Sequence, residues 1–311
     1  MTKRSLMLGG LAAGFVAATL IGCGGGASQK PTVTAKSSKK AEGGGDTAEA
    51  GATTEKADGG AKAPAPGGFG SFTGRVVLKG TAPEQKWIAK KGAGDDVVKD
   101  SAVCAAEDLP DEKLVVGADG GVANVFIYLQ KVPAGAKVPP VPTEPAVFDQ
   151  KFCRFLPHAS TYRVGQTINI ISDDNVTHNT HTNPNNPDNE AISKSIAPND
   201  RTGIPMVYNG AEKEPLFVKC DIHGFMAAWH LPLAHTFVAV TDKDGKFEIK
   251  DVPSGTHEFI VWHEAPKYIE RKLKITIEAD KATEKELSYD ASKFAVNNDH
   301  PVRTVIISSR D

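Results

Sequence analysis

The sequence predicts an all-β fold, and three features of the chain indicate it. Short runs of β-branched and aromatic residues are separated by Gly, Pro, Asn and Asp, as strands are separated by turns. Segments with apolar residues at helical spacing are few. The sequence Asp242-Lys-Asp-Gly245 lies between two of the runs, and Gly245 supplies the positive φ that a hairpin turn needs. We therefore expect many short strands and little helix.

The predicted strands are distributed from residue 72 to residue 289. In chain order they cover residues 72–79, 122–130, 146–152, 167–172, 216–219, 236–241, 246–250, 257–262, 272–278 and 283–289. A short helix is expected just before Cys104.

The N-terminus has the features of an export signal. Lys3 and Arg4 precede an uncharged stretch that runs to Gly22 and is followed by Cys23. This stretch resembles the lipobox of bacterial lipoproteins, in which the cysteine is lipidated and becomes the mature N-terminus. We expect residues 1–22 to be a signal peptide and Cys23 to carry a lipid anchor in the cell envelope or periplasm. The alternative is an uncleaved membrane anchor, which also places the rest of the chain outside the cytoplasm.

The next segment has a composition that does not favour folding. Residues 23–68 consist mainly of Gly, Ala, Lys, Thr, Ser and Glu, with almost no large apolar side chain. We expect a tether between the membrane and the folded part. The formal charge is -2 over 311 residues, so the chain lacks the basic excess that would indicate nucleic-acid binding.

Four residues have the identities and order of a mononuclear copper site: His178, Cys220, His223 and Met226. The last three lie in one compact stretch, Cys220-Asp-Ile-His223-Gly-Phe-Met226. A soft thiolate, two imidazoles and a thioether form a ligand set that favours copper. The sequence therefore predicts one copper ion. The alternative is a metal-free scaffold in which Cys220 and Met226 are core residues.

The segments around these residues resemble cupredoxins. Phe155-Leu-Pro157, Gly165-Gln166 and Asn175-Val-Thr-His178-Asn179 are similar to the strands of plastocyanin and amicyanin that deliver the first copper histidine. The Cys-x2-His-x2-Met spacing resembles the amicyanin ligand loop, although Ile222 replaces a usual proline. The resemblance implies a type 1 copper domain with a Greek-key β-sandwich at residues 141–232. It also implies that Asn179 steadies the ligand loop. Phe225 and Trp229 are expected either to keep the site dry or to be ordinary core residues of the sandwich.

A second resemblance involves both flanks of that domain. Residues 72–80 and 122–129, together with 240–249, 252–255 and 257–262, are similar to a carboxypeptidase-regulatory-like, transthyretin-type sandwich. We expect residues 69–140 and 233–290 to form this sandwich, with the copper domain inserted in it and residues 291–311 as a tail. Two modules in tandem are the alternative.

The remaining cysteines and a nearby histidine complete the candidate residues. The chain has four cysteines, and after lipid at Cys23 and metal at Cys220 the pair Cys104 and Cys153 remains. An oxidising compartment favours a disulfide between them, the alternative being two free thiols. His181 lies three residues after His178 and is expected on the opposite face of an extended strand.

These features predict a membrane-tethered electron carrier rather than an enzyme. The sequence has no nucleophile elbow, phosphate loop or paired-carboxylate motif, and it lacks the His-x-His pairs of multicopper oxidases. The expected partners are exported redox proteins such as a cytochrome c. Two other functions fit the same residues: a copper-handling or copper-storing lipoprotein, and a cell-envelope module that binds carbohydrate or protein.

Overall fold

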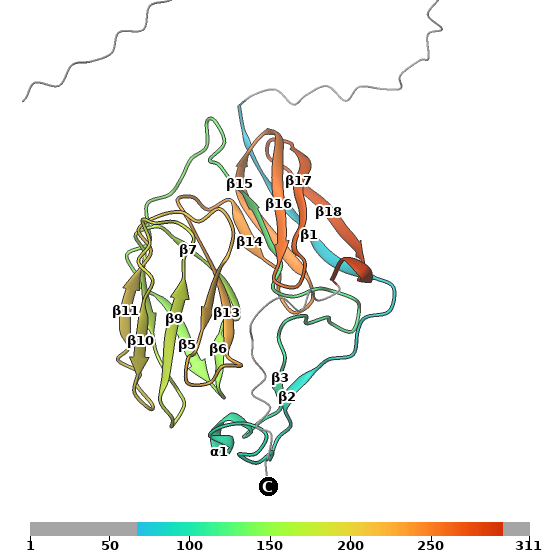
Figure 1. The fold of residues 1–311 in the computed structure, drawn as a ribbon. Helices are drawn as coiled ribbons and strands as arrows, with labels where there is room; N and C mark the ends of the chain where they lie inside the picture. Colours follow the sequence, from blue (N-terminus) through green and yellow to red (C-terminus); the bar gives the residue numbers. More distant parts are fainter. Residues whose placement is uncertain (1–66, 295–311) are drawn as a thin grey trace, which may run out of the picture. The chain divides into compact units, whose positions relative to one another are not determined.

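The computed structural model describes residues 67–294, and their regular secondary structure is almost entirely β-strand (Figure 1). Within this range the helical elements are α1 (Ser101–Cys104) and the 3-10 turn η1 (Ala291–Phe294). The all-β prediction is confirmed. The predicted signal peptide, Cys23, most of the tether and the tail from residue 295 onward lie outside the described residues. Among the helices of residues 67–294, none has the length and apolar character needed to cross a membrane.

Strands from both flanks of the chain build one sandwich, which we call the flanking sandwich. Its first sheet has the order β15-β1-β18, and its second has the order β14-β4-β16-β17. The strands β5 to β13 lie between β4 and β14 in the chain, yet β4 and β14 are paired. Their bounds are β1 (Phe69–Lys79), β4 (Phe126–Leu129), β14 (Val238–Val240), β15 (Lys246–Pro253), β16 (Gly255–His263), β17 (Lys267–Ile277) and β18 (Ala282–Asp290).

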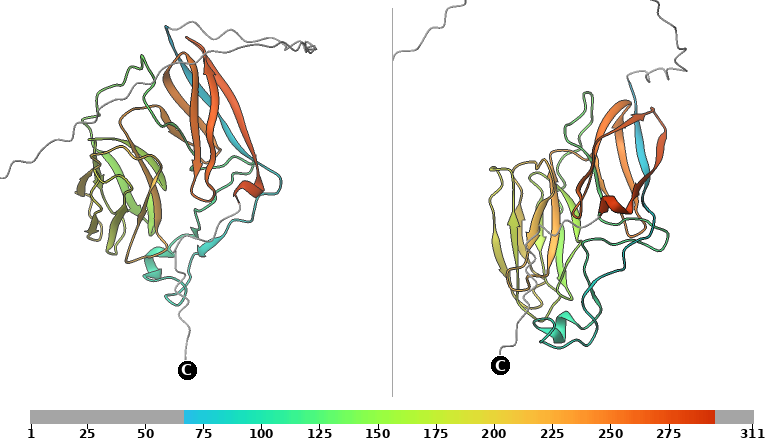
Figure 2. Two further views of the ribbon diagram at one scale, coloured as in Figure 1. Left: turned by 45° about the horizontal axis from the view of Figure 1, so that its top comes forward. Right: turned by 45° about the vertical axis from the view of Figure 1, so that its right-hand side comes forward.

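The strands between β4 and β14 form a second sandwich, which we call the inserted sandwich. One sheet has the order β10-β9-β12-β13-β7, and the other has the order β11-β8-β5-β6. Figure 2 shows these strands, coloured green to yellow, as one layered group. Their bounds are β5 (Ala146–Lys151), β6 (Arg154–Leu156), β7 (Ala159–Arg163), β8 (Thr167–Ile170), β9 (His178–Asn183), β10 (Ser193–Ile196), β11 (Ile204–Val207), β12 (Leu216–Lys219) and β13 (Ala227–Leu233).

Strand β4 is buried on both faces, and its sequence Phe-Ile-Tyr-Leu reflects this. Ile127 and Leu129 belong to the core of the flanking sandwich, whereas Phe126 and Tyr128 belong to a separate apolar cluster. Successive side chains of a strand point to opposite faces, so a strand covered on both sides needs a continuous apolar run. The second cluster contains residues of β7 and β13 from the inserted sandwich. The two sandwiches therefore share an apolar contact.

Trp229 lies in this contact. Its ring centroid is 5.0 Å from that of Trp262 of β16, and Lys267 Nζ lies 3.8 Å from the Trp229 ring. The indole Nε1 donates a hydrogen bond of 2.9 Å to Glu264 Oε2. Trp229 thus packs between the sandwiches, which corrects the expectation that it keeps the metal site dry.

The segment between β1 and β4 packs on the inserted sandwich, and we call residues 81–113 the cover segment. It contains β2 (Trp87–Ala89), α1 and β3 (Leu109–Pro110). Its buried residues Ala89, Val98 and Leu109 belong to the same core cluster as Phe148 and Val218 of the inserted sandwich. The assignment of all of residues 69–140 to the flanking sandwich was therefore wrong for this segment, because its apolar side chains are buried elsewhere.

The hairpin turn predicted at Gly245 is confirmed. Gly245 has φ +77°, and its N–H donates to Asp242 O at 2.9 Å, between β14 and β15. A Cβ at this position would lie 2.4 Å from Val76 O, so the turn requires glycine for both conformation and space. The short helix expected before Cys104 is α1, which ends at that residue.

Candidate metal centre

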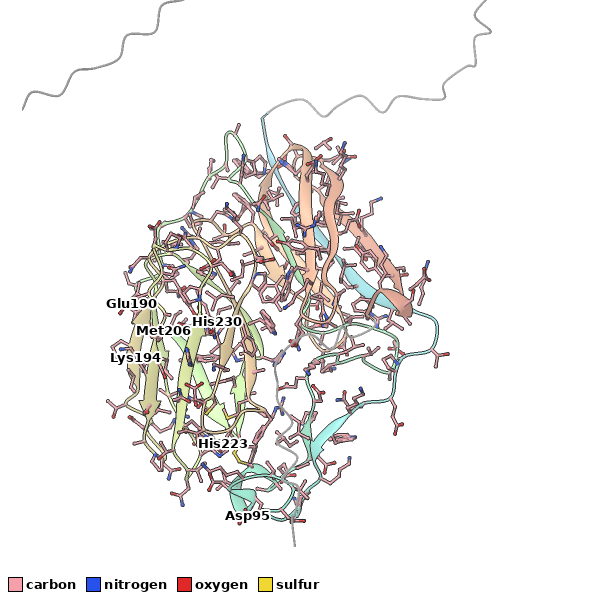
Figure 3. All side chains as sticks on the ribbon, viewed as in Figure 1. Asp95, Glu190, Lys194, Met206, His223 and His230 are labelled. Carbon is pink, nitrogen blue, oxygen red and sulfur yellow. A yellow bond between two sulfur atoms is a disulfide. The ribbon has the colours of Figure 1, made fainter. Side chains whose placement is uncertain are left out.

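Three of the four predicted ligands converge beside the end of strand β12. Figure 3 labels one of them, His223, near the lower end of the inserted sandwich. One ligand atom each from His178, Cys220 and His223 lies within 4.8 Å of the other two. The Nδ1 atoms of the two histidines are 3.0 Å apart, and Cys220 Sγ is 4.0 Å from His223 Nδ1. All three residues are at most 1% exposed. The site is thus a compact, buried group of one sulfur and two imidazole nitrogens.

The strand pairing explains why residues so far apart in the chain meet. Strand β9 begins at His178 and pairs antiparallel with β12, which ends at Lys219 just before Cys220. Strand β12 in turn pairs with β13, so residues 220–226 form the connection between two neighbouring strands. Backbone hydrogen bonds close that connection, from Met226 N to His223 O at 2.8 Å and from Cys220 N to Met226 O at 3.3 Å.

Asn179 joins the two ligand-bearing segments. Its backbone N–H points at Cys220 Sγ at 3.5 Å, and the N–H of His223 approaches the same sulfur at 3.4 Å. The Asn179 side chain accepts a hydrogen bond from Asp221 N at 2.6 Å and donates to Asp221 Oδ2 and Ser193 Oγ at 2.9 Å each. These contacts are those expected of a residue that steadies the loop beside a thiolate.

Both histidines have a carboxylate at their outer nitrogen. His178 Nε2 lies 2.8 Å from Asp174 Oδ2, and His223 Nε2 lies 2.9 Å from Asp100 Oδ2. A carboxylate accepts only, so each Nε2–H donates to its carboxylate and Nδ1 is the ring nitrogen that faces the site. Hydrogen bonds of this kind orient ligand histidines and raise their basicity. The two Nδ1 atoms that face one another are therefore the ring nitrogens placed to bind a metal ion.

The same contacts shift the pKa values of two ligands. Burial raises the pKa of the Cys220 thiol, but hydrogen bonds with His178 and His223 outweigh burial and lower it to about 6. For His178, burial lowers the pKa, while the hydrogen bonds to Asp174 and Cys220 raise it to about 9. The metal-free site therefore favours a thiolate next to an imidazolium. A metal cation bound by Nδ1 of His178 would take the place of that imidazolium proton.

Met226 and Phe225 lie beside this group, next to a cavity. Met226 is 2% exposed and belongs to the same core cluster as Cys220. The Phe225 ring is 5.8 Å from the His223 ring. Both residues line a cavity of about 830 Å³ whose other walls include Trp87 and Ile88 of the cover segment. Phe225 thus lies beside the His223 ring.

The donor set of the described residues fits copper. Cys220 supplies a thiolate with a lowered pKa, the histidines supply two oriented Nδ1 atoms, and Met226 supplies a buried thioether on the same loop. Thiolate and thioether sulfur with two imidazoles is the combination typical of blue-copper sites. Carboxylates bond the outer nitrogens and do not enter the group of His178, Cys220 and His223.

Cys104 and Cys153 form a disulfide. This is the pair that the cysteine count left over, and it joins α1 of the cover segment to the turn between β5 and β6. Among the cysteines of residues 67–294, Cys220 alone is free, and it is buried. The disulfide holds the cover segment against the end of the sandwich that carries the ligands.

His181 lies outside the ligand group, as expected from its position on the strand. Its Nδ1 is 2.8 Å from Asp221 Oδ2, and the side chain is partly exposed. Among the described residues, it is absent from the groups whose ligand atoms lie close enough to share an ion. A three-residue offset on β9 has thus placed His178 and His181 on opposite faces.

A second buried histidine makes an ion pair that joins the two sandwiches. His158 Nε2 bonds Glu264 Oε1, and His158 Nδ1 lies 3.7 Å from Glu112 Oε2. Arg154 donates to Glu112 at 2.6 Å. Burial lowers the pKa of His158, but attraction to Glu264 outweighs it and raises the value to about 9. This pair also lines the cavity beside Phe225.

Sequence reasoning missed the two carboxylates of the site. Asp174 lies four residues before His178, but nothing in its sequence context distinguishes it from Asp173. Asp100 comes from the cover segment, 123 positions before His223, and no sequence motif connects the two. A signal was present only for Asp174, as an acidic residue close to a predicted ligand.

Comparisons with known proteins gave matches to solved structures over part of the chain. No family model matches this chain, and no curated protein does. A copper-containing nitrite reductase from Thermus scotoductus SA-01 matches with a TM-score of 0.26 and 15% identity over 33% of this chain and 25% of that one. An amicyanin variant in its reduced state matches with a TM-score of 0.26 and 17% identity over 32% of this chain and 98% of that one. A Cu(I) form of another amicyanin variant matches with a TM-score of 0.26 and 17% identity over 35% of this chain and 99% of that one. The chain spans about a quarter of the nitrite reductase.

Proposed function

We propose that this chain is a type 1 copper protein that carries single electrons between exported redox proteins. The ligands are His178, Cys220, His223 and Met226. One observation carries the proposal: a thiolate and two Nδ1 atoms converge in a buried group while both Nε2 atoms are held by carboxylates. When bound, copper supplies a one-electron couple. The chain has no role in turnover chemistry under this proposal.

The protein's own residues prepare the site for that couple. Cys220 enters as a thiolate because the two histidines lower its pKa, so little work is needed to deprotonate it. Asp174 and Asp100 fix the ring orientations before metal binds. Burial of the ligands and the bonds to Asn179 oppose rearrangement of the loop. A site that keeps one geometry in both oxidation states exchanges electrons with little reorganisation.

The cellular setting is part of the same proposal. A lipid at Cys23 would tether the folded part to a bacterial membrane, with residues 23–68 as the linker, and a soluble cytochrome c is a suitable partner class. The segments that support this setting are the charged N-terminus, the uncharged run and Gly22-Cys23. Radiolabelled fatty acid incorporated by the wild-type chain and lost in Cys23→Ala tests the anchor.

Copper loading of the full-length protein tests the site. We expect an intense thiolate-to-copper charge-transfer band in the visible spectrum of the Cu(II) form, and its loss in Cys220→Ser. His181→Ala is the matched control, because His181 is a nearby histidine that bonds Asp221 outside the ligand group. A colourless wild-type protein after loading, or a band lost equally in the control, would overturn the proposal.

A second function, copper handling or storage, is favoured by a specific observation. The His223 side chain has no exposed surface, because Asp100 and the cover segment lie against it. Electron tunnelling falls steeply with distance, so a covered ligand edge slows transfer to a docked partner. Stopped-flow oxidation of the Cu(I) protein by a soluble cytochrome c separates the two functions: fast reaction supports the carrier, and slow reaction supports handling.

A further inference from the structure

The Cys104–Cys153 disulfide lies against the metal-binding residues. The Sγ atoms of Cys104 and Cys153 and a ring nitrogen of His223 all lie within 4.8 Å of one another, and the three residues are buried. A second group of the same kind joins Cys153 to Asp174 and His178. The disulfide sulfurs are thus close to both imidazoles of the centre. A disulfide whose only role was to attach the cover segment to the inserted sandwich could lie anywhere along their contact. Its position beside the metal-binding residues therefore calls for an explanation.

The backbone holds Cys153 in this place at some cost. Phe152 and Cys153 form the two-residue turn between β5 and β6, and their φ angles are +51° and +53°. Turns of this kind usually contain Asn or Gly, because other side chains are strained at positive φ. The Asp174 carboxylate accepts the N–H of Phe152 at 2.6 Å and that of Cys153 at 2.8 Å. The same carboxylate holds His178, so one residue positions the disulfide turn and a metal ligand together.

A cavity connects this place to small reagents. Cys153 lines the cavity of about 830 Å³, as do His223 and Met226. The cavity walls therefore include one sulfur of the disulfide and two of the predicted copper ligands. Cys153 is among the residues that line the cavity and Cys104 is not, so an ion or thiol that enters the cavity reaches Cys153 first.

We propose that reduction of this disulfide creates a second binding site, for Cu(I), with the thiolates of Cys104 and Cys153 as ligands beside the His223 ring. A dithiol reductant supplies the two electrons and two protons: its two S–H bonds give one S–S bond, while the Cys104–Cys153 S–S bond gives two thiols. Binding of Cu(I) then releases both thiol protons to solvent. Soft thiolate ligands select Cu(I) over harder cations.

This site goes beyond the proposed function and does not depend on it. The thiols of Cys104 and Cys153 take no part in the set of His178, Cys220, His223 and Met226, so the two sites share no ligand. The oxidised chain would therefore hold one copper ion, and the reduced chain two in adjacent places. The disulfide would set the copper capacity of the protein according to the thiol redox state of its surroundings.

Anaerobic titration of the full-length protein with Cu(I) tests the proposal. The ion is delivered in competition with a chromophoric chelator, to the chain as purified and to the chain reduced by a dithiol that is then removed. We expect the tightly bound Cu(I) to rise from about one to about two ions per chain on reduction. An unchanged stoichiometry in a reduced chain that retains its circular dichroism spectrum would overturn the proposal.

Variants and a chemical block assign the extra ion. It should be lost in Cys104→Ala and in Cys153→Ala, and also when the reduced Cys220→Ser chain is alkylated with iodoacetamide, because Cys104 and Cys153 are then the thiols of residues 67–294. It should persist in Cys220→Ser, which removes the first site, so failure of the proposed function and failure of this site give different results. Retention of the extra ion after alkylation, or uptake of Zn(II) in place of Cu(I), would refute the assignment.

Discussion

The Nε2 atom of His223 lies 2.9 Å from Oδ2 of Asp100, a residue 123 positions earlier in the chain. Asp100 is the residue before α1 and has φ +55°, but its side chain does not cap that helix. Its carboxylate instead faces a predicted metal ligand. An N-cap position that gives up its usual hydrogen bond for a contact outside the helix indicates that the cover segment is part of the metal centre.

The first prediction concerns this carboxylate. Asp100→Ala should weaken copper binding about 10- to 100-fold, because loss of an outer hydrogen bond leaves the ligand ring less oriented and less basic. The reduction potential should rise, since a negative charge near the imidazole stabilises the oxidised, more positive ion. Competition titration and voltammetry measure the two effects. Asp96→Ala, which removes an exposed carboxylate of the same segment, should change neither; equal effects of the two variants would contradict the assigned role.

The second prediction concerns Asp174, which organises the disulfide turn and His178. Asp174→Ala should lower the free energy of unfolding by about 2–5 kcal/mol, because it leaves the N–H groups of Phe152 and Cys153 without their acceptor. Asp174→Asn keeps one acceptor oxygen and should cost less. Urea unfolding measures both. The matched control is Asp173→Ala, whose ion pair with Lys151 is exposed and should contribute less than about 1 kcal/mol.

Two glycines with opposite surroundings give a third prediction. A Cβ at Gly224 would have no atom within 4 Å, and its backbone does not have positive φ. Gly224→Ala should therefore stabilise the protein by about 0.4–1 kcal/mol and leave the copper spectrum unchanged. Gly245→Ala should destabilise it by more than about 1 kcal/mol, because φ is +77° and the Cβ would meet Val76 O. Thermal unfolding compares them, and a shifted copper spectrum in Gly224→Ala would show that the loop needs its flexibility.

The sequence was informative where chemistry is local. Each predicted strand overlaps an observed one, because the alternating or continuous apolar pattern of a strand can be recognised from the residues of that segment alone. Cys220, His223 and Met226 could be found because they lie on one loop. Strand β9, His-Asn-Thr-His-Thr-Asn, was not among the predicted strands. It lies between β10 and β12 with most of its polar residues buried, and it has no apolar pattern from which a strand could be predicted. Strand β13 contains Pro232, which argues against a strand.

Long-range contacts account for what the sequence did not predict. Asp100 meets His223 only because the cover segment packs on the inserted sandwich, and that packing depends on scattered apolar residues such as Val98 and Leu109. The same holds for Glu264, which reaches His158 across the contact between the sandwiches. Such pairs are set by the tertiary arrangement of elements, whereas composition and spacing report on one segment at a time.

The ion pair of His158 and Glu264 gives a pH-dependent prediction. The pKa of His158 is raised from 6.5 to about 9 in the folded protein. A raised pKa means that the folded state binds the proton more tightly, so the pair's contribution to stability is complete below pH 6.5 and is lost as the pH rises through about 9. In Glu264→Gln the attraction to Glu264 is absent, while burial still lowers the pKa of His158 and only the weaker attraction to Glu112 raises it, so this pKa should fall. NMR titration of the His158 ring measures this directly in both proteins. Urea unfolding of the copper-loaded proteins measures their free energies of unfolding. The wild type should be more stable than Glu264→Gln, and this difference should shrink between pH 7 and pH 9.5. A difference that grows over this range would contradict the assignment.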